Sequence, residues 1–280
     1  MGRLGRGQRA AIVGAVVALA AASVRAETGE ASDEPAREKD IEGAVGLILS
    51  YHPAYPGAST LEAGLVPAGF LRWGRISVTG AGGFTTRRHD DVERGLGAEL
   101  VRRERVRMSL NLRYDNGRSE SDSPELAGMG DIKRTVRARL AVRWDVDENW
   151  RLGLSASVDA LDRVGGYVVE LNAARQWPLP RDTVAQLGLA MSAASDRFQQ
   201  AWFGVSPEQS ARSGHPVYRV PEGMSLRDAG ISGTLRTDFG PRWSGFVTVG
   251  LSRSLGAAAD SPLTGRATSA SASTGLAWRF

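Results

Sequence analysis

The sequence predicts an all-β protein: an antiparallel transmembrane β-barrel of about twelve strands. Three features predict it, namely an export leader, segments that alternate apolar with polar or small residues, and tryptophans at the ends of those segments. At such positions an indole ring contacts acyl chains while its N–H reaches water. Six of the seven tryptophans are placed this way: Trp73, Trp144, Trp150, Trp177, Trp243 and Trp278.

Residues 1–26 have the form of a cleaved signal peptide. Three arginines precede an apolar run over 10–22, and Ala26 is the expected last residue before cleavage. The run of roughly 13 residues is shorter than the approximately 20 that a membrane-spanning helix requires. We therefore expect an exported chain in which the acidic, non-periodic residues 27–40 form a flexible periplasmic tail and 41–280 form the barrel.

Composition narrows the classes of function. The chain has 35 Lys and Arg against 31 Asp and Glu, and the excess of basic residues lies in the leader. A neutral mature chain gives no support to nucleic-acid binding, which needs a basic field on one face. The absence of cysteine excludes a lipid-modified N-terminal cysteine, disulfides, thiol nucleophiles and cysteine-based metal sites.

The strands follow from a period of two. Between Thr135 and Trp144, apolar side chains alternate with Thr135, Arg137, Arg139 and Arg143. The same alternation predicts strands at 43–51, 62–72, 75–84, 91–101, 104–114, 132–144, 149–160, 166–177, 183–194, 226–239, 243–254 and 266–280.

The predicted connections alternate between short and long, with 161–165 as the exception. Short periplasmic turns and longer external loops are typical of outer-membrane barrels, and an even strand number returns both termini to the periplasm. A soluble β-sandwich is the alternative fold, because it also has one apolar face on each strand. It leaves the alternation of loop lengths and the tryptophan positions unexplained.

The last predicted strand carries an assembly signal. Trp278 and Phe280 share its apolar face, and outer-membrane proteins are commonly recognised by their assembly machinery through a final strand that ends in phenylalanine. We therefore expect outer-membrane lipid and the barrel assembly machinery as partners.

Three stretches of sequence resemble one known family. They are 114–132, with the segment Leu126-Ala127-Gly128-Met129-Gly130-Asp131-Ile132; the loop 203–223; and 255–263 together with the closing Trp278-Arg279-Phe280. On these stretches the chain is similar to the MipA/OmpV family of outer-membrane proteins, which contains the MltA-interacting protein. The family-motif residues of the second stretch are Phe203, Gly204, Val205, Ser206, Ser213, Gly214, Tyr218 and Gly223.

The resemblance implies a barrel in the cell outer membrane and several alternative roles. The named member is described as a scaffold that links a lytic transglycosylase to a murein synthase, and other members are discussed as porin-like or adhesive. Scaffolding of peptidoglycan enzymes is therefore our first hypothesis, and a narrow porin-like channel or a surface adhesin is the alternative. No residue carries over as a proven contact, and glycines in these loops are expected to serve backbone geometry.

Arginines are concentrated on the polar face of two neighbouring strands. If this face lines the lumen, its potential is positive unless Glu93, Glu99, Asp159 or Glu170 pair with the arginines. We expect such pairing, and incomplete pairing would give an anion-preferring pore. The lumen-lining candidates are Arg105, Arg107, Arg113, Arg137, Arg139 and Arg143.

The longest connection, 195–225, contains Trp202, Phe203 and Tyr218, and this aromatic content predicts that it folds inward or covers the barrel mouth.

The sequence offers little material for catalysis, cofactors or metals. Ser213-Gly214-His215 lacks the third group that orients a base, so no enzyme is expected. His89-Asp90-Asp91 could bind a cation only weakly, and a solvated loop explains it better.

Overall fold

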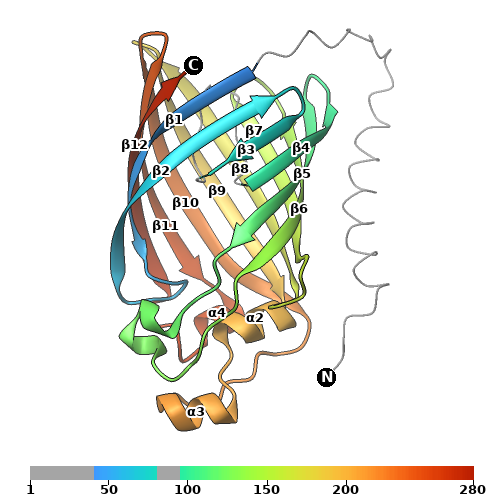
Figure 1. Ribbon diagram of the computed structural model, residues 1–280, viewed down its shortest axis with the longest axis vertical. Coiled ribbons are helices and arrows are strands. Elements are labelled where there is room, and N and C mark those ends of the chain that lie inside the picture. Colours follow the sequence, from blue (N-terminus) through green and yellow to red (C-terminus); the bar gives the residue numbers. More distant parts are fainter. Residues whose placement is uncertain (1–40, 81–94) are drawn as a thin grey trace.

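The computed structural model describes residues 41–80 and 95–280, which form a closed barrel of twelve antiparallel strands (Figure 1). The predicted leader and tail, together with His89-Asp90-Asp91 and Glu93, lie outside the described residues. The strands are β1 (Ile41–Pro53), β2 (Leu61–Trp73), β3 (Ile76–Thr79), β4 (Gly95–Arg102), β5 (Val106–Asp115), β6 (Thr135–Asp145), β7 (Trp150–Asp159), β8 (Tyr167–Leu179), β9 (Thr183–Ser195), β10 (Met224–Phe239), β11 (Trp243–Ser254) and β12 (Thr268–Arg279).

The predicted fold class is confirmed. Each strand pairs with its neighbour in sequence, and β1 pairs with β12, with Ala44 opposite Arg279 and Tyr51 opposite Ala272. Closure gives each strand of the described chain a neighbour on both sides, which is how strands satisfy their backbone groups in lipid.

The outer surface of the barrel is apolar. Along β1, Val45, Leu47 and Leu49 are about half exposed, while Ala44 and Ile48 on the other face point inward and are buried. The same outward alternation places leucine, valine and isoleucine around the wall. None of the helices in the described part of the chain is long and apolar enough to cross a membrane.

The tryptophans of the strands gather at the end with the short turns. Trp243 lies directly opposite Trp278 in the β11–β12 ladder, and the guanidinium of Arg175 lies 5.4 Å from the ring centroid of Trp150 and 5.1 Å from that of Trp177. This end faces the periplasm in an outer-membrane barrel.

An aromatic ring lies across the junction between β12 and β1, which we call the seam. The backbone N–H of Phe280 donates to the carbonyl of Gly43 (3.0 Å), and its ring lies where a side chain at position 43 would stand. Trp278 contacts this ring at a centroid distance of 5.6 Å. Glycine at position 43 therefore makes room for the ring across the seam.

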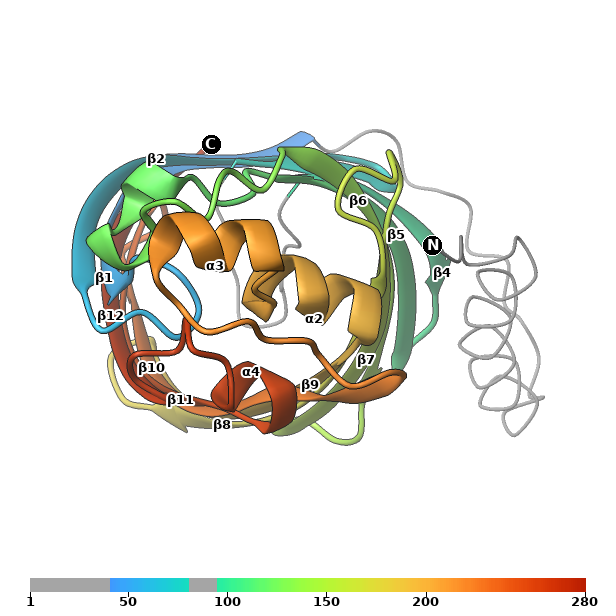
Figure 2. The same ribbon diagram turned by 90° about the horizontal axis from the view of Figure 1, so that it is seen from below.

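Four of the longer loops meet over the opposite, external mouth (Figure 2). We call them the cap: residues 54–60, 116–134, 196–223 and 255–267. The cap contains α2 (Asp196–Phe203), α3 (Pro207–Ser213), α4 (Gly256–Ala259) and the 3-10 turns η1 (Glu120–Asp122) and η2 (Pro124–Leu126). The segment 195–225 thus covers the mouth, and it contains two helices joined and followed by non-helical chain.

The cap is close-packed. Its inner side chains form two small apolar clusters, one around Tyr55 and Leu126 and one around Met129, Val205 and Leu263. Of the largest side chains that the described structure buries almost completely, most lie here: Leu126, Met129, Val205 and Leu263.

Candidate functional site

The two sides of the lumen differ. On the side built by β1, β2 and β12, Ala44, Ile48, Ala68, Phe70 and Ala277 form a buried apolar cluster, against which Phe246 of β11 packs. We call it the apolar side, and it fills the lumen with side chains.

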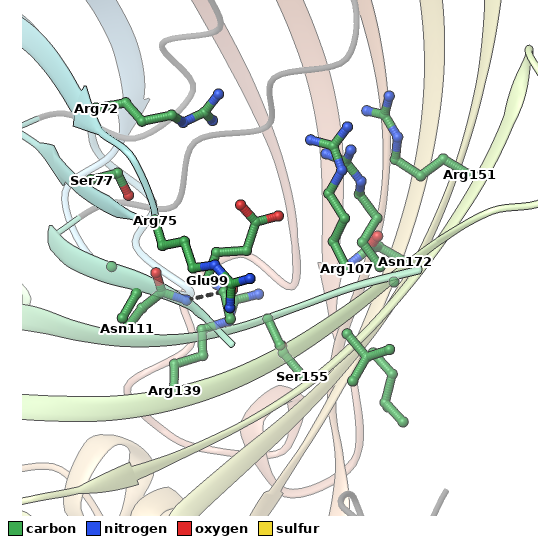
Figure 3. Close-up of a pocket in the computed structure, with 18 residues that line it drawn as sticks. Arg72, Arg75, Ser77, Glu99, Arg107, Asn111, Arg139, Arg151, Ser155 and Asn172 are labelled. Atoms are coloured by element: carbon green, nitrogen blue, oxygen red, sulfur yellow. Dashed lines mark hydrogen bonds between the residues drawn. The ribbon is translucent and has the colours of Figure 1, made fainter. Parts of the chain in front are cut away.

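On the other side the lumen holds a cavity of about 290 Å³ (Figure 3). It lies in the half of the barrel nearest the short turns and is lined by β2 to β8. Among the described residues, its charged lining consists of Arg72, Arg75, Arg107, Arg139, Arg143, Arg151 and the acid Glu99. Its uncharged polar lining consists of Ser77, Ser109, Asn111, Ser155 and Asn172. We call this the arginine side.

Strand alternation and register create the arginine side. On β5 the inward residues are Arg107, Ser109 and Asn111, and on β6 they include Arg139 and Arg143. The register places Arg107 directly opposite Arg143, and like charges directly opposite each other destabilise a sheet. The same ladder places Arg113 opposite Arg137. Two such pairs on one hairpin need a compensating source of negative charge.

Carboxylates of the barrel wall supply part of that charge. Glu170 accepts from Arg139 (2.9 Å), and Asp145 accepts from Arg151 (3.0 Å) and Arg143 (3.4 Å). Glu42 lies 3.7 Å from Arg72.

The compensation is incomplete. Among residues 41–80 and 95–280, no ion pair or side-chain hydrogen bond joins Arg75 or Arg107 to a carboxylate, and the buried Nε of Arg107 has no partner. Glu42, Glu99, Asp145 and Glu170 lie in the lining or pair with its arginines or with Arg102, and among the described residues none of these four pairs with Arg75 or Arg107. Of the partners that the sequence suggested for the arginines, Glu170 binds Arg139, whereas Glu99 binds Arg102. Asp159 instead accepts from Thr135 and from the backbone of the β7–β8 loop.

The six arginine candidates do not all reach the cavity. Arg107, Arg139 and Arg143 line it, whereas Arg105 is exposed at the short turn before β5 and Arg113 lies further along that strand. Arg137 is buried beneath α2, with its guanidinium 4.9 Å from the ring centroid of Phe198. The sequence analysis missed Arg72, Arg75 and Arg151; the alternation along β7 is the signal that places Arg151 on the polar face.

The family-motif residues build the cap rather than the cavity. Phe203 and Val205 are buried, and the carbonyl of Phe203 accepts from Ser261 (2.6 Å). Ser206 caps the N-terminus of α3, with Gln209 completing a capping box. Gly214, with φ of 77°, ends that helix in the left-handed region that glycine adopts most readily.

The remaining motif residues also have places in the cap. Tyr218 donates to the carbonyl of Ala257 (3.0 Å), Ser213 accepts from the backbone of His215, and Gly223 donates to Asp196. The imidazole of His215 lies 2.8 Å from the carbonyl of Glu125, so its contact is with the cap backbone and not with the Ser213 hydroxyl.

Two polar side chains of the loop 116–134, the half-buried Glu125 and the buried Arg118, join it to two other cap loops. Glu125 accepts from Tyr55 (2.6 Å) and from Ser59, and Arg118 donates to the carbonyl of Trp202 (2.7 Å). Burial opposes ionisation of Glu125, but the hydrogen bonds from Ser59 and Tyr55 outweigh it and hold the pKa of this carboxyl below its ordinary value. Burial, together with the hydrogen bond to Glu125, raises the pKa of Tyr55.

No group of three or more metal-binding side chains occurs within 41–80 and 95–280.

The family described as MltA-interacting protein MipA matches residues 45–280. The chain belongs to this family. A relative in Escherichia coli (strain K12), the outer membrane protein YiaT, is 29% identical over 152 residues, which are 53% of this chain and 59% of that protein. The match therefore spans about three fifths of the relative's length. The protein is located in the outer membrane, as this MipA family membership and the outward apolar surface indicate.

The chain is also similar, at low TM-scores, to solved outer-membrane barrels. The NanC porin has a TM-score of 0.43 at 8% identity, with 84% of this chain and 98% of that chain covered. Salmonella typhi OmpF in complex with daunomycin has a TM-score of 0.40 at 10% identity, with 86% and 97% covered.

Proposed function

We propose that this protein provides a narrow path for small anions across the outer membrane, with the arginine side as its selective region. The observation that carries the proposal is the pair Arg75 and Arg107, which line the cavity without an ion pair among the described residues. Rings of arginine or lysine are a common source of anion preference in pores. An anion in the cavity would also relieve the repulsion between Arg107 and Arg143.

The path is expected to be narrow for two reasons. The apolar side fills part of the cross-section, and the cap covers the external mouth. Twelve strands also fall between the eight-stranded barrels that side chains fill and the sixteen-stranded porins that leave a channel. We therefore expect small conductance steps.

Planar-bilayer recording under a salt gradient tests the proposal. We expect chloride to permeate better than potassium, and Arg107→Gln to reduce this preference several-fold. Arg175→Gln is the matched control, because Arg175 packs on tryptophans of the outer surface and its loss should leave the preference unchanged. Equal permeability of the two ions in the unmodified protein would contradict the proposal.

A scaffolding role is a second candidate, supported by the match to a family described by its interaction with MltA. On this hypothesis a lytic transglycosylase and a murein synthase contact the periplasmic face of the barrel. Cross-linking of whole envelopes followed by co-purification should then recover one of these enzymes. Repeated failure to recover either would count against the scaffold and leave the anion path untouched.

The absence of catalytic activity remains part of the proposal. Membership of an outer-membrane barrel family supports it, and so does the position of His215.

A further inference from the structure

Two asparagines of the arginine side each lie over a glycine of the neighbouring strand. Asn111 of β5 is directly opposite Gly97 of β4, and Asn172 of β8 is directly opposite Gly153 of β7. A Cβ at position 97 would stand 2.5 Å from Oδ1 of Asn111, and one at position 153 would stand 2.4 Å from Oδ1 of Asn172. Real Cβ atoms do not approach so closely, so both amides occupy space that only glycine leaves free.

The two pairs flank the arginines. Between them lies β6 with Arg139 and Arg143, so the lining runs from amide to guanidinium to amide across neighbouring strands (Figure 3). Ser109 accepts from the amide of Asn111 at 3.0 Å, which fixes its orientation. Ser77 and Ser155 add hydroxyls to the same surface.

This lining contains more uncharged hydrogen-bonding groups than selection for charge alone requires. A halide or phosphate needs only the guanidinium groups, whereas amides and hydroxyls both donate and accept and therefore match alcohol groups. None of the described residues that line the cavity is aromatic, so a planar aromatic anion would gain no stacking. The volume of about 290 Å³ is roughly that of ten waters at ~30 Å³ each, enough for a six-carbon acid.

We propose that the cavity binds hydroxylated organic anions of the sugar-acid class. The carboxylate binds Arg75 or Arg107, which line the cavity without an ion pair among the described residues, and the hydroxyl groups bind the amides of Asn111 and Asn172. Gly97 and Gly153 are positioning residues, because they let the amides lie flat against the wall. The inference rests on the proposed anion path and names its class of solute.

Titration calorimetry on the full-length protein in detergent tests the inference. The probes are gluconate and hexanoate, which carry the same charge on six carbons but differ in hydroxyl groups. Gluconate should bind at least ten-fold more tightly, because two or more added hydrogen bonds of about 1 kcal/mol each exceed the ~1.4 kcal/mol that a factor of ten represents.

Variants distinguish the contribution of the amides to binding from that of the arginine charges. In Asn111→Ala combined with Asn172→Ala, the ratio of the two affinities should fall towards one. Gly153→Ala should lower the ratio too, since its methyl displaces the Asn172 amide, which is the movable end of a side chain. Gly69→Ala is the matched control, because a Cβ at position 69 meets nothing within 4 Å and the ratio should stay as in the unmodified protein.

The outcomes distinguish this inference from the proposed function. If both anions bind equally and chloride selectivity is present, the sugar-acid inference is wrong and the anion path stands. If neither anion binds and the bilayer recordings show no anion preference, both are wrong. The inference would also be overturned if the affinity ratio stayed unchanged in the double variant Asn111→Ala/Asn172→Ala and in Gly153→Ala. Heat-modifiable migration on gels confirms that each variant has folded.

Discussion

The apolar side and the arginine side of the lumen form one barrel with opposite chemistry. On the apolar side, Ala44 and Phe70 pack carbon against carbon and are almost fully buried. On the arginine side, Arg107 faces Arg143 across one ladder, and Arg107 has no ion pair within the described chain. Apolar side chains occupy the inward positions of the apolar side, so the fold itself does not require arginines at inward positions. The difference teaches that the arginine side is retained at a cost to stability, as binding sites usually are.

The largest effect on the difference between the two sides is expected when the charge of the arginine side is reversed. Arg75→Glu combined with Arg107→Glu should convert chloride preference into cation preference, because the change removes the two arginines without an ion pair among the described residues and adds two acids to the lining. The reversal potential under a salt gradient measures this directly. A variant that folds and still prefers chloride would show that selectivity arises elsewhere.

A second prediction concerns the apolar side. Phe70→Ala should destabilise the barrel by about 3 kcal/mol, the lower end of the range for a buried phenylalanine, because water entering the lumen relieves part of the void. It should also increase the conductance. Denaturant-induced unfolding in detergent and single-channel recording measure the two effects.

Phe239→Ala is the control for that variant, because Phe239 is 58% exposed and does not belong to the apolar cluster of the lumen. Equal destabilisation by the two changes would mean that the apolar side is not a packed core.

The smallest effect is expected in the cap. The pKa of Glu125 lies below its ordinary value of 4.5, so the stabilisation it gives is complete above that value and is lost as the pH falls through the folded-state pKa. The contribution of Glu125 to the midpoint temperature of thermal unfolding should therefore be constant from neutral pH to about pH 5 and decline below about pH 4.5. In Glu125→Gln, with Tyr55 and Ser59 unchanged, this part of the decline should vanish; an unchanged profile would assign the acid sensitivity to other carboxylates.

Local patterns were sufficient to predict the barrel wall. Alternation along β6, the tryptophans beside short turns and the alternation of loop lengths are all consequences of one lipid-facing surface, so each is visible in the sequence. The capping box of Ser206 and Gln209, with Pro207 at the first helical position, also marked α3, although the sequence analysis did not use it.

The site depended on register, which sequence alone does not give. β5 and β6 are joined by the long segment 116–134, so nothing local determines that Arg107 should meet Arg143. The same holds for Asn172 and Gly153, whose strands are joined by 160–166. These strand pairings determine which arginines have an acidic partner. The cap likewise depends on contacts among four loops distant in sequence, such as that of Arg118 with Trp202.

The contact of Phe280 with Gly43 has a consequence for biogenesis. The ring contacts β1 and belongs to Phe280, the residue that follows β12, so it can reach Gly43 only when these two strands meet. A nascent barrel still open between them exposes both the ring and the glycine groove that receives it. A larger residue at position 43 would clash with the ring, so we expect it to hinder the pairing of β12 with β1 that closes the barrel.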